Sequence, residues 1–112
     1  DMREAPSLTI VPYLVGNGAK VRVVDPQGHH EGAALLPGVN WVEDAYKAAQ
    51  NADALVILTE WNAFRALDLK RLAKRMTTPA MADLRNVYAA RDAARAGFTT
   101  YLSIGRKGFG AD

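Results

Sequence analysis

Four consecutive residues, Asp83-Leu84-Arg85-Asn86, carry the side chains best suited to binding chemistry in this chain of 112 residues. The guanidinium of Arg85 is planar and permanently charged, and its fork of donors suits a phosphate or a carboxylate. Asp83, two residues earlier, could hold that guanidinium in place. The same spacing fits a structural ion pair between Asp83 and Arg85, and spacing alone favours the ion pair.

Asp25 follows a predicted strand, as does the acidic residue that binds a ribose hydroxyl in dinucleotide-binding folds. That role requires a glycine-rich turn earlier in the chain. Gly16-Asn17-Gly18 begins like G-x-G-x-x-G, but Val21 stands at the third glycine position and the segment leads from a helix into a strand. We therefore interpret these glycines as a helix stop and Asp25-Pro26 as the start of a turn.

The segment His29-His30-Glu31 contains zinc-ligand side chains. A zinc site needs three or four convergent ligands, and the chain has no other histidine and no cysteine. We expect a solvated loop here. A G-x-S-x-G motif is also absent, so the sequence predicts neither a metal site nor a catalytic residue within this chain.

Two further clusters have a structural explanation and a functional alternative. Trp61 and Phe64 follow a predicted strand and could form a wall against a base, although packing at the edge of the core is favoured. A run of cations late in a predicted helix would stabilise the negative end of its dipole, with an anion-binding patch as the alternative. These cations are Lys70, Arg71, Lys74 and Arg75.

Alternating helices and strands position these residues. Apolar spacing predicts a helix over 7–15, in which Pro12 requires either a later start or a bend. The apolar run 54–58 lacks alternation, as expected of a parallel strand covered on both faces, and is predicted to be the central strand. The other predicted elements are strands over 20–24, 80–84 and 98–102, a long loop after Asp25, and helices over 42–50, over 69–76 with Asp68 as N-cap, and over 89–96 with Gly97 as its stop.

This order predicts an α/β fold: a Rossmann-like three-layer sandwich with a mostly parallel sheet and helices on both faces. Ligands in open α/β sheets bind outside the carboxyl ends of the strands. The clusters at such ends are Asp25-Pro26, Thr59-Glu60-Trp61-Asn62 and Asp83-Leu84-Arg85-Asn86. The glycine-containing tail 104–110 is predicted to be frayed or a linker remnant.

The composition excludes several classes of protein. A single domain over 1–112 is expected from the length, and 49% hydrophobic with 23% charged residues is typical of a globular chain. The net charge of +2 is too small to indicate nucleic acid binding. No apolar run is long enough for a membrane span, and residues 1–4 do not begin a secretory signal. The absence of cysteine permits a reducing compartment, and a cytoplasmic location is expected.

Motifs in register along nearly the whole chain closely resemble the C-terminal, UDP-binding domain of UDP-glucose 6-dehydrogenases, in the UDP-glucose/GDP-mannose dehydrogenase family. Each motif alone is modest, but their order is specific. The matching stretches are Asp1-Met2-Arg3-Glu4-Ala5-Pro6-Ser7, Val24-Asp25-Pro26, Ala52-Asp53-Ala54-Leu55-Val56-Ile57-Leu58-Thr59-Glu60-Trp61, Asp83-Leu84-Arg85-Asn86 and Ser103-Ile104-Gly105-Arg106.

The resemblance implies a parent enzyme that oxidises UDP-glucose to UDP-glucuronate in two NAD-dependent steps, through a thioester on a catalytic cysteine. Arg3, in D-x-R-E, matches an arginine that contacts NAD across the domain interface. Arg85, in D-x-R-N, matches an arginine that contacts the nucleotide sugar. In the family the main NAD domain, a substrate-binding lysine, the dimerising helix and the cysteine all lie upstream, so this chain alone is expected to be inactive and the full enzyme to be a homo-oligomer.

A stand-alone flavodoxin-like binding or signalling module is the alternative from a different class. A receiver domain of that type would need clustered acids at the end of its first strand, and Asp25 alone fits this poorly. A natural start codon just before Asp1 would favour the stand-alone module, whereas a longer gene would favour the dehydrogenase.

Overall fold

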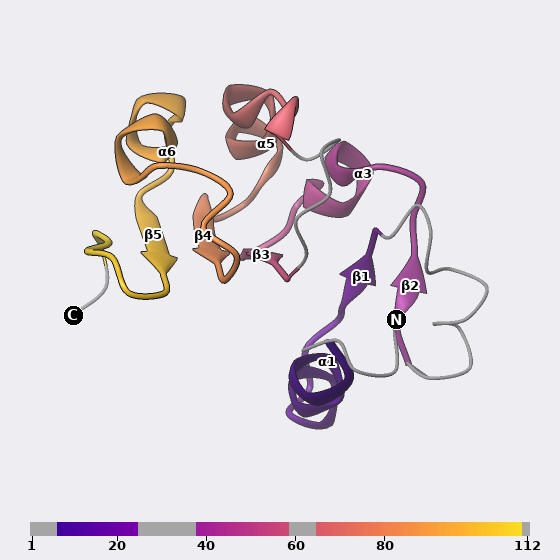
Figure 1. Cartoon of the computed structure of the whole chain (residues 1–112). Coiled ribbons are helices and arrows are strands. Elements are labelled where there is room, and N and C mark those ends of the chain that lie inside the picture. The colour runs from indigo at the N-terminus through magenta and orange to yellow at the C-terminus, as the bar shows by residue number, and fades with distance from the viewer. Residues whose placement is uncertain (1–6, 25–37, 59–64, 111–112) are drawn as a thin grey trace. The chain divides into compact units, whose positions relative to one another are not determined.

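The computed structural model describes residues 7–24, 38–58 and 65–110 (Figure 1). These residues belong to two compact units, 1–48 and 49–112, which are described one at a time. Both units combine parallel strands with helices. The predicted α/β class with parallel strands is therefore confirmed.

The first unit begins with helix α1 (Ser7–Gly16). Pro12 lies inside this helix, so the interpretation that the helix starts after Ser7 is wrong. Gly18, at φ +91°, follows the helix, and its N–H bonds the carbonyl of Val15 at 3.0 Å. The glycines at this point therefore end a helix, as predicted, because the left-handed backbone that ends it favours glycine.

Two short strands follow, β1 (Arg22–Val23) and β2 (Asn40–Trp41), and they pair in parallel. The sequence predicts β1 but places β2 in a loop. The N–H of Asn40 bonds the carbonyl of Val21 at 2.9 Å, which anchors the pairing. A strand of two residues is too short to show a period-2 pattern, and it is defined by its partner.

Helix α3 (Ala45–Ala49) is shorter than the predicted helix over 42–50. The predicted range places Glu43 and Asp44 in the first turn of this helix, and this is wrong because the helix begins after them. Asp44 instead caps it, accepting a hydrogen bond from the Lys47 N–H on Oδ1 at 2.8 Å. Such a cap satisfies a donor that the first turn leaves without a helical partner.

The second unit contains a parallel sheet in the order β3-β4-β5. Its elements are β3 (Leu55–Ile57), α5 (Leu69–Arg75), β4 (Ala80–Asp83), α6 (Ala90–Ala96) and β5 (Thr100–Ser103). The sequence correctly predicts all of them, but β4, not the strand of the apolar run 54–58, is the middle strand of this sheet. The strand over 80–84 is predicted from its place between two predicted helices, since its residues have little intrinsic preference for a strand.

The caps of both helices agree with the sequence. Asp68 accepts a hydrogen bond from the Arg71 N–H at 3.1 Å at the start of α5, and Gly97 ends α6 at φ +107°. The two helices lie side by side (Figure 1). They bury Leu72 and Ala93 completely, which gives the unit its core.

The two faces of this sheet differ in burial. Met81 and Tyr101 lie in register and are 1% and 0% exposed. The next row, Val56–Ala82–Leu102, points to the opposite face, and Val56 is 38% and Leu102 45% exposed. Successive side chains of a strand alternate between faces, so the buried row contains the residues that can build a fixed site.

The tail after β5 is packed against the sheet, so the prediction that 104–110 is frayed is wrong. The backbones of Tyr101 and Phe109 exchange two hydrogen bonds of 2.9 Å, and their rings stack at 6.1 Å. A Cβ at Gly108 would overlap the carbonyl oxygen of Tyr101, and one at Gly110 would overlap that of Thr99. The glycines therefore permit close approach to β5 rather than flexibility.

Among the residues that the structure describes, no helix is long and apolar enough to cross a membrane.

Candidate functional site

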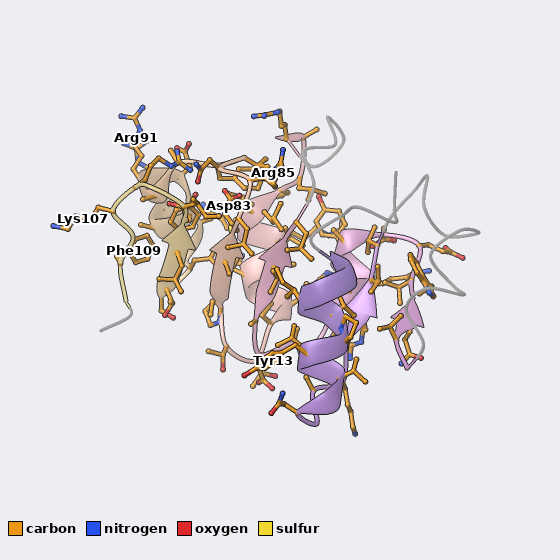
Figure 2. All side chains as sticks on the ribbon, turned by 60° about the horizontal axis from the view of Figure 1, so that its bottom comes forward. Tyr13, Asp83, Arg85, Arg91, Lys107 and Phe109 are labelled. Atoms are coloured by element: carbon orange, nitrogen blue, oxygen red, sulfur yellow. The ribbon has the colours of Figure 1, made fainter. Side chains whose placement is uncertain are left out.

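The candidate site lies at the carboxyl ends of β3, β4 and β5, where the turn 84–88 leads from β4 towards α6. The N–H of Leu84 bonds the carbonyl of Ile57 at 3.0 Å, which fixes the start of the turn to the end of β3. Figure 2 shows Asp83 and Arg85 near each other at this end of the strands. Parallel α/β sheets bind their ligands at this edge.

The carboxylate of Asp83 is fully buried at the end of β4. It accepts hydrogen bonds from the N–H of Val87 at 3.0 Å, from the N–H of Tyr88 at 2.8 Å and from the hydroxyl of Tyr101 at 2.8 Å. Burying a carboxylate is costly unless hydrogen bonds compensate it. Asp83 therefore holds the backbone of the turn 84–88 and connects it to β5 through Tyr101. The sequence predicts only that Asp83 holds or pairs with the guanidinium of Arg85, and it does not predict this role.

Tyr101 connects this carboxylate to a second arginine. Its hydroxyl oxygen is 3.0 Å from Nη2 of Arg106, and the same Nη2 donates to the carbonyl of Tyr88 at 2.7 Å. The hydroxyl also lies 2.8 Å from that carbonyl, but it has one proton, and the carboxylate of Asp83 is the stronger acceptor. Burial first, and then the hydrogen bond to Asp83, raises the pKa of Tyr101 to about 12, so the phenol stays neutral.

Asn86 holds the other side of the turn. It adopts φ +53°, a left-handed conformation that asparagine tolerates better than most residues. Its Nδ2 donates to the carbonyl of Ile104 at 3.0 Å, and its Oδ1 accepts from the N–H of Ile104 at 3.3 Å. The amide therefore pairs with the backbone that follows β5.

Arg85 stands between these two anchored residues with its side chain exposed to solvent. Arg65 donates to the carbonyl of Val87 in the same turn at 3.4 Å. Together with Arg106, these residues place arginines from three separate segments around one turn. The site is positively charged and suits a ligand with concentrated negative charge.

Sequence reasoning finds Arg85 but assigns no role to Arg65, Tyr101 or Arg106. Arg106 could have been identified from the sequence, because it follows a predicted strand and ligands bind at the carboxyl ends of such strands. Tyr101 and Arg65 carry no such signal. Only the folded chain brings their polar atoms to the turn.

Other candidate residues lie outside the described part of the chain. They are Arg3, the segment 29–31 with its zinc-ligand side chains, the cluster 25–26, and the cluster 59–64, which contains Trp61 and Phe64. Within 7–24, 38–58 and 65–110, no group of three or more His, Cys, Asp or Glu side chains could hold a metal ion.

The cations of α5 form a surface of their own. Lys74 and Arg75 lie in the last turn of α5, where positive charge stabilises the helix dipole, but Lys70 and Arg71 lie in its first turn, so the prediction that all four cations stand late in the helix is wrong. Together with Gln50 and Asp68, the basic residues of α5 line an open depression of about 510 Å³. Nη1 of Arg75 donates to Oε1 of Gln50 at 3.3 Å.

Residues 1–90 match the family described as UDP-glucose/GDP-mannose dehydrogenase family, UDP binding domain. The chain is 48% identical over 106 residues to the UDP-glucose 6-dehydrogenase of Rhizobium meliloti, which covers 95% of this chain and 24% of that protein. It is 39% identical over 112 residues to the UDP-glucose 6-dehydrogenase of Pseudomonas aeruginosa, with 95% and 24% covered. The match is to the C-terminal part of these relatives.

Among solved structures, the chain is similar to the NDP-N-acetyl-D-galactosaminuronic acid dehydrogenase of Methanosarcina mazei Go1. The TM-score is 0.73 at 29% identity, and the match covers 96% of this chain and 22% of that one. The chain thus spans 24% of the length of the two curated relatives and less of the solved structure.

Proposed function

Because the chain belongs to the UDP-glucose/GDP-mannose dehydrogenase family, as a UDP-binding domain, we propose that it holds UDP-glucose for an NAD-dependent oxidation to UDP-glucuronate. Residues 1–112 then act as the C-terminal domain of a longer UDP-glucose 6-dehydrogenase. The chain spans 24% of its curated relatives, which is consistent with one domain of such an enzyme.

One observation supports this proposal more than any other. The exposed arginine at position 85 lies on a turn that Asp83 holds from inside the sheet and Asn86 holds from the side of β5. A turn held in this way fixes the backbone position of Arg85 before the ligand arrives, so less backbone entropy is lost on binding. Arg85 is the residue that we propose to contact the diphosphate of the nucleotide sugar, by charge-assisted hydrogen bonds.

We propose that the principal site for NAD lies in a part of the enzyme outside this chain. Gly16 and Gly18 end α1, and their surroundings are open, so they form no glycine-rich cradle at the start of a helix. We assign to this chain one contact with NAD, through Arg3, across the interface with the domain that binds the cofactor. The cofactor accepts the hydride, and this chain positions the substrate.

The thiol on which the family's oxidation depends must come from outside these residues, because the sequence contains no cysteine. We therefore propose that the 112-residue chain alone does not oxidise UDP-glucose. We also propose, from the family resemblance, that the full enzyme is a cytoplasmic homo-oligomer. Measurable reduction of NAD by the purified chain would contradict this assignment.

The direct test is a titration with UDP followed by amide NMR spectra, which detects even millimolar affinity. We expect saturable shifts that concentrate on the turn 84–88 and on 103–106. ADP serves as the control nucleotide, since it has the same diphosphate with a different base. Absence of any saturable response to UDP, in the chain and in the full-length protein, would contradict the proposed function.

A further inference from the structure

We propose that Arg106 is a positioning residue for the nucleotide site, acting through Tyr101 and Asp83 on the turn that bears Arg85. This inference rests on the proposed function, because it assumes that Arg85 contacts the ligand. The residues that link the turn to the chain after β5 are called the edge clamp. They are Asp83, Asn86, Tyr101 and Arg106.

The first part of the edge clamp is a chain of two hydrogen bonds that joins the guanidinium of Arg106 to the carboxylate of Asp83 through the neutral phenol of Tyr101. Nη2 of Arg106 lies 3.0 Å from the hydroxyl of Tyr101, and that hydroxyl lies 2.8 Å from Oδ2 of Asp83. A buried carboxylate is stabilised by a nearby positive charge as well as by its hydrogen-bond donors. Arg106 supplies that charge from the surface, with the phenol as the bridge.

The second part is a direct bond from Arg106 to the turn. The same Nη2 donates to the carbonyl of Tyr88 at 2.7 Å, and the N–H of Tyr88 donates to Asp83 at 2.8 Å. The backbone N–H and the carbonyl of Tyr88 are therefore both hydrogen-bonded to members of the edge clamp. Opening the far end of the turn therefore requires breaking the bond between Arg106 and the Tyr88 carbonyl as well as the bonds to Asp83.

The third part fixes the near end of the turn. Asn86 makes two hydrogen bonds to the backbone of Ile104, two residues before Arg106. The segment 104–106 therefore holds the turn at residues 86 and 88, both of which follow Arg85 in the chain. A change at Arg106 should reach Arg85 through the backbone, without direct contact between the two guanidinium groups.

The charge of Arg106 has a second consequence. Within 7–24, 38–58 and 65–110 its hydrogen bonds all come from Nη2, so Nε and Nη1 retain their donors. Its side chain is exposed at the same carboxyl edge as that of Arg85. The residue that fixes the turn thereby also adds positive charge to the edge that receives the diphosphate.

A purely structural role for the tail is the alternative, because the tail also covers the outer edge of β5. In that case Arg106 would contribute to stability and not to affinity. Lys107 separates the two roles. It is the neighbouring exposed cation, and Figure 2 shows it pointing outward from the tail. Its removal changes the net charge by the same amount and leaves the edge clamp intact.

The test compares Arg106→Met, Arg106→Lys and Lys107→Met in the full-length protein, with the dissociation constant for UDP and the midpoint of thermal unfolding as readouts. We expect Arg106→Met to weaken UDP binding roughly tenfold, the scale of one lost hydrogen bond to a charged group. Arg106→Lys should recover part of the affinity, because the charge stays while the planar fork is lost. Lys107→Met should leave the affinity within about twofold of wild type.

Two results would overturn the inference while leaving the proposed function standing. One is wild-type affinity in Arg106→Met alongside lost affinity in Arg85→Ala. The other is an equal loss in Arg106→Met and Lys107→Met, which would mean that only net charge matters.

A readout without ligand tests the edge clamp even if UDP does not bind. The amide protons of Val87 and Tyr88 are held by Asp83, so their hydrogen exchange reports whether the turn is closed. We expect faster exchange in Arg106→Met than in Lys107→Met. Unchanged exchange would overturn the edge clamp, whereas a failure of wild type to bind UDP, with the expected exchange, would contradict the proposed function alone.

Discussion

The hydroxyl of Tyr101 lies 2.8 Å from Oδ2 of Asp83, and both side chains are fully buried. This bond joins the ends of neighbouring strands β4 and β5 immediately below the turn that carries Arg85. Aspartate side chains are rarely fully buried unless they are hydrogen-bonded or paired with a charge. The hydrogen-bond partners of Asp83 show that it fixes the turn 84–88 at the carboxyl edge of the sheet.

Replacing Arg85 with alanine should weaken UDP binding by about 1–3 kcal/mol, the contribution of a hydrogen bond to a charged group. Isothermal titration calorimetry of the full-length protein measures this difference. Arg91→Ala is the matched control, because Arg91 is another exposed arginine and belongs to α6 instead of the turn. Equal affinities of Arg85→Ala and wild type would remove Arg85 from the site.

Replacing Tyr101 with phenylalanine should lower the free energy of unfolding by about 1–3 kcal/mol, because one donor to the buried carboxylate is lost. Urea denaturation with linear extrapolation gives the value. Tyr13→Phe is the control, since Tyr13 is 70% exposed to solvent. A loss no larger than that of Tyr13→Phe would show that the bond between Tyr101 and Asp83 adds no net stability.

The stability of the wild-type protein should fall as the pH rises from 10 to 12, in part through Tyr101. Burial and the hydrogen bond to Asp83 raise the pKa of Tyr101 from 10.0 to about 12. The unfolded chain therefore loses this proton first, so the contribution is fully present below the unfolded pKa and disappears as the pH passes the folded pKa.

Urea denaturation at several pH values, for wild type and Tyr101→Phe, isolates this contribution from those of other groups. The difference between the two curves should shrink across the interval from pH 10 to pH 12. A constant difference would show that Tyr101 titrates alike in both states.

Replacing Gly108 with alanine should detach the tail from β5, because a Cβ at this position would overlap the carbonyl oxygen of Tyr101. We expect a loss of about 1–3 kcal/mol in stability, typical of a side chain forced into occupied space. Hydrogen exchange of the Phe109 amide, which bonds that carbonyl, measures the detachment. Gly16→Ala is the control, since no atom lies within 4 Å of a Cβ there, and fast exchange in both variants would contradict the prediction.

Local patterns in the sequence predict the helices and strands of the second unit well. Asp68 and Gly97 mark helix ends because capping depends on a few neighbouring atoms. The strand β4 follows from its place between two helices. The two-residue strand β2 could not be predicted, since it has no periodicity and exists only by pairing with β1.

The tail shows how a correct observation can lead to a wrong conclusion. Glycines at 105, 108 and 110 are typical of a frayed segment, and two of them are instead needed for contact with the β5 backbone. Whether a glycine provides flexibility or close approach depends on what lies beside it. That neighbour, the carbonyl of Tyr101, is several residues away in the chain.

The sequence by itself determined the α/β class, the family resemblance and the selection of Arg85, because periodicity, caps and motifs are encoded by residues close together in the chain. The tertiary structure alone decided what Asp83, Asn86, Tyr101 and Arg106 do. Their hydrogen bonds join β4, its turn and the segment after β5 across separations of up to 18 residues. Such contacts depend on the register of neighbouring strands, which no local pattern contains.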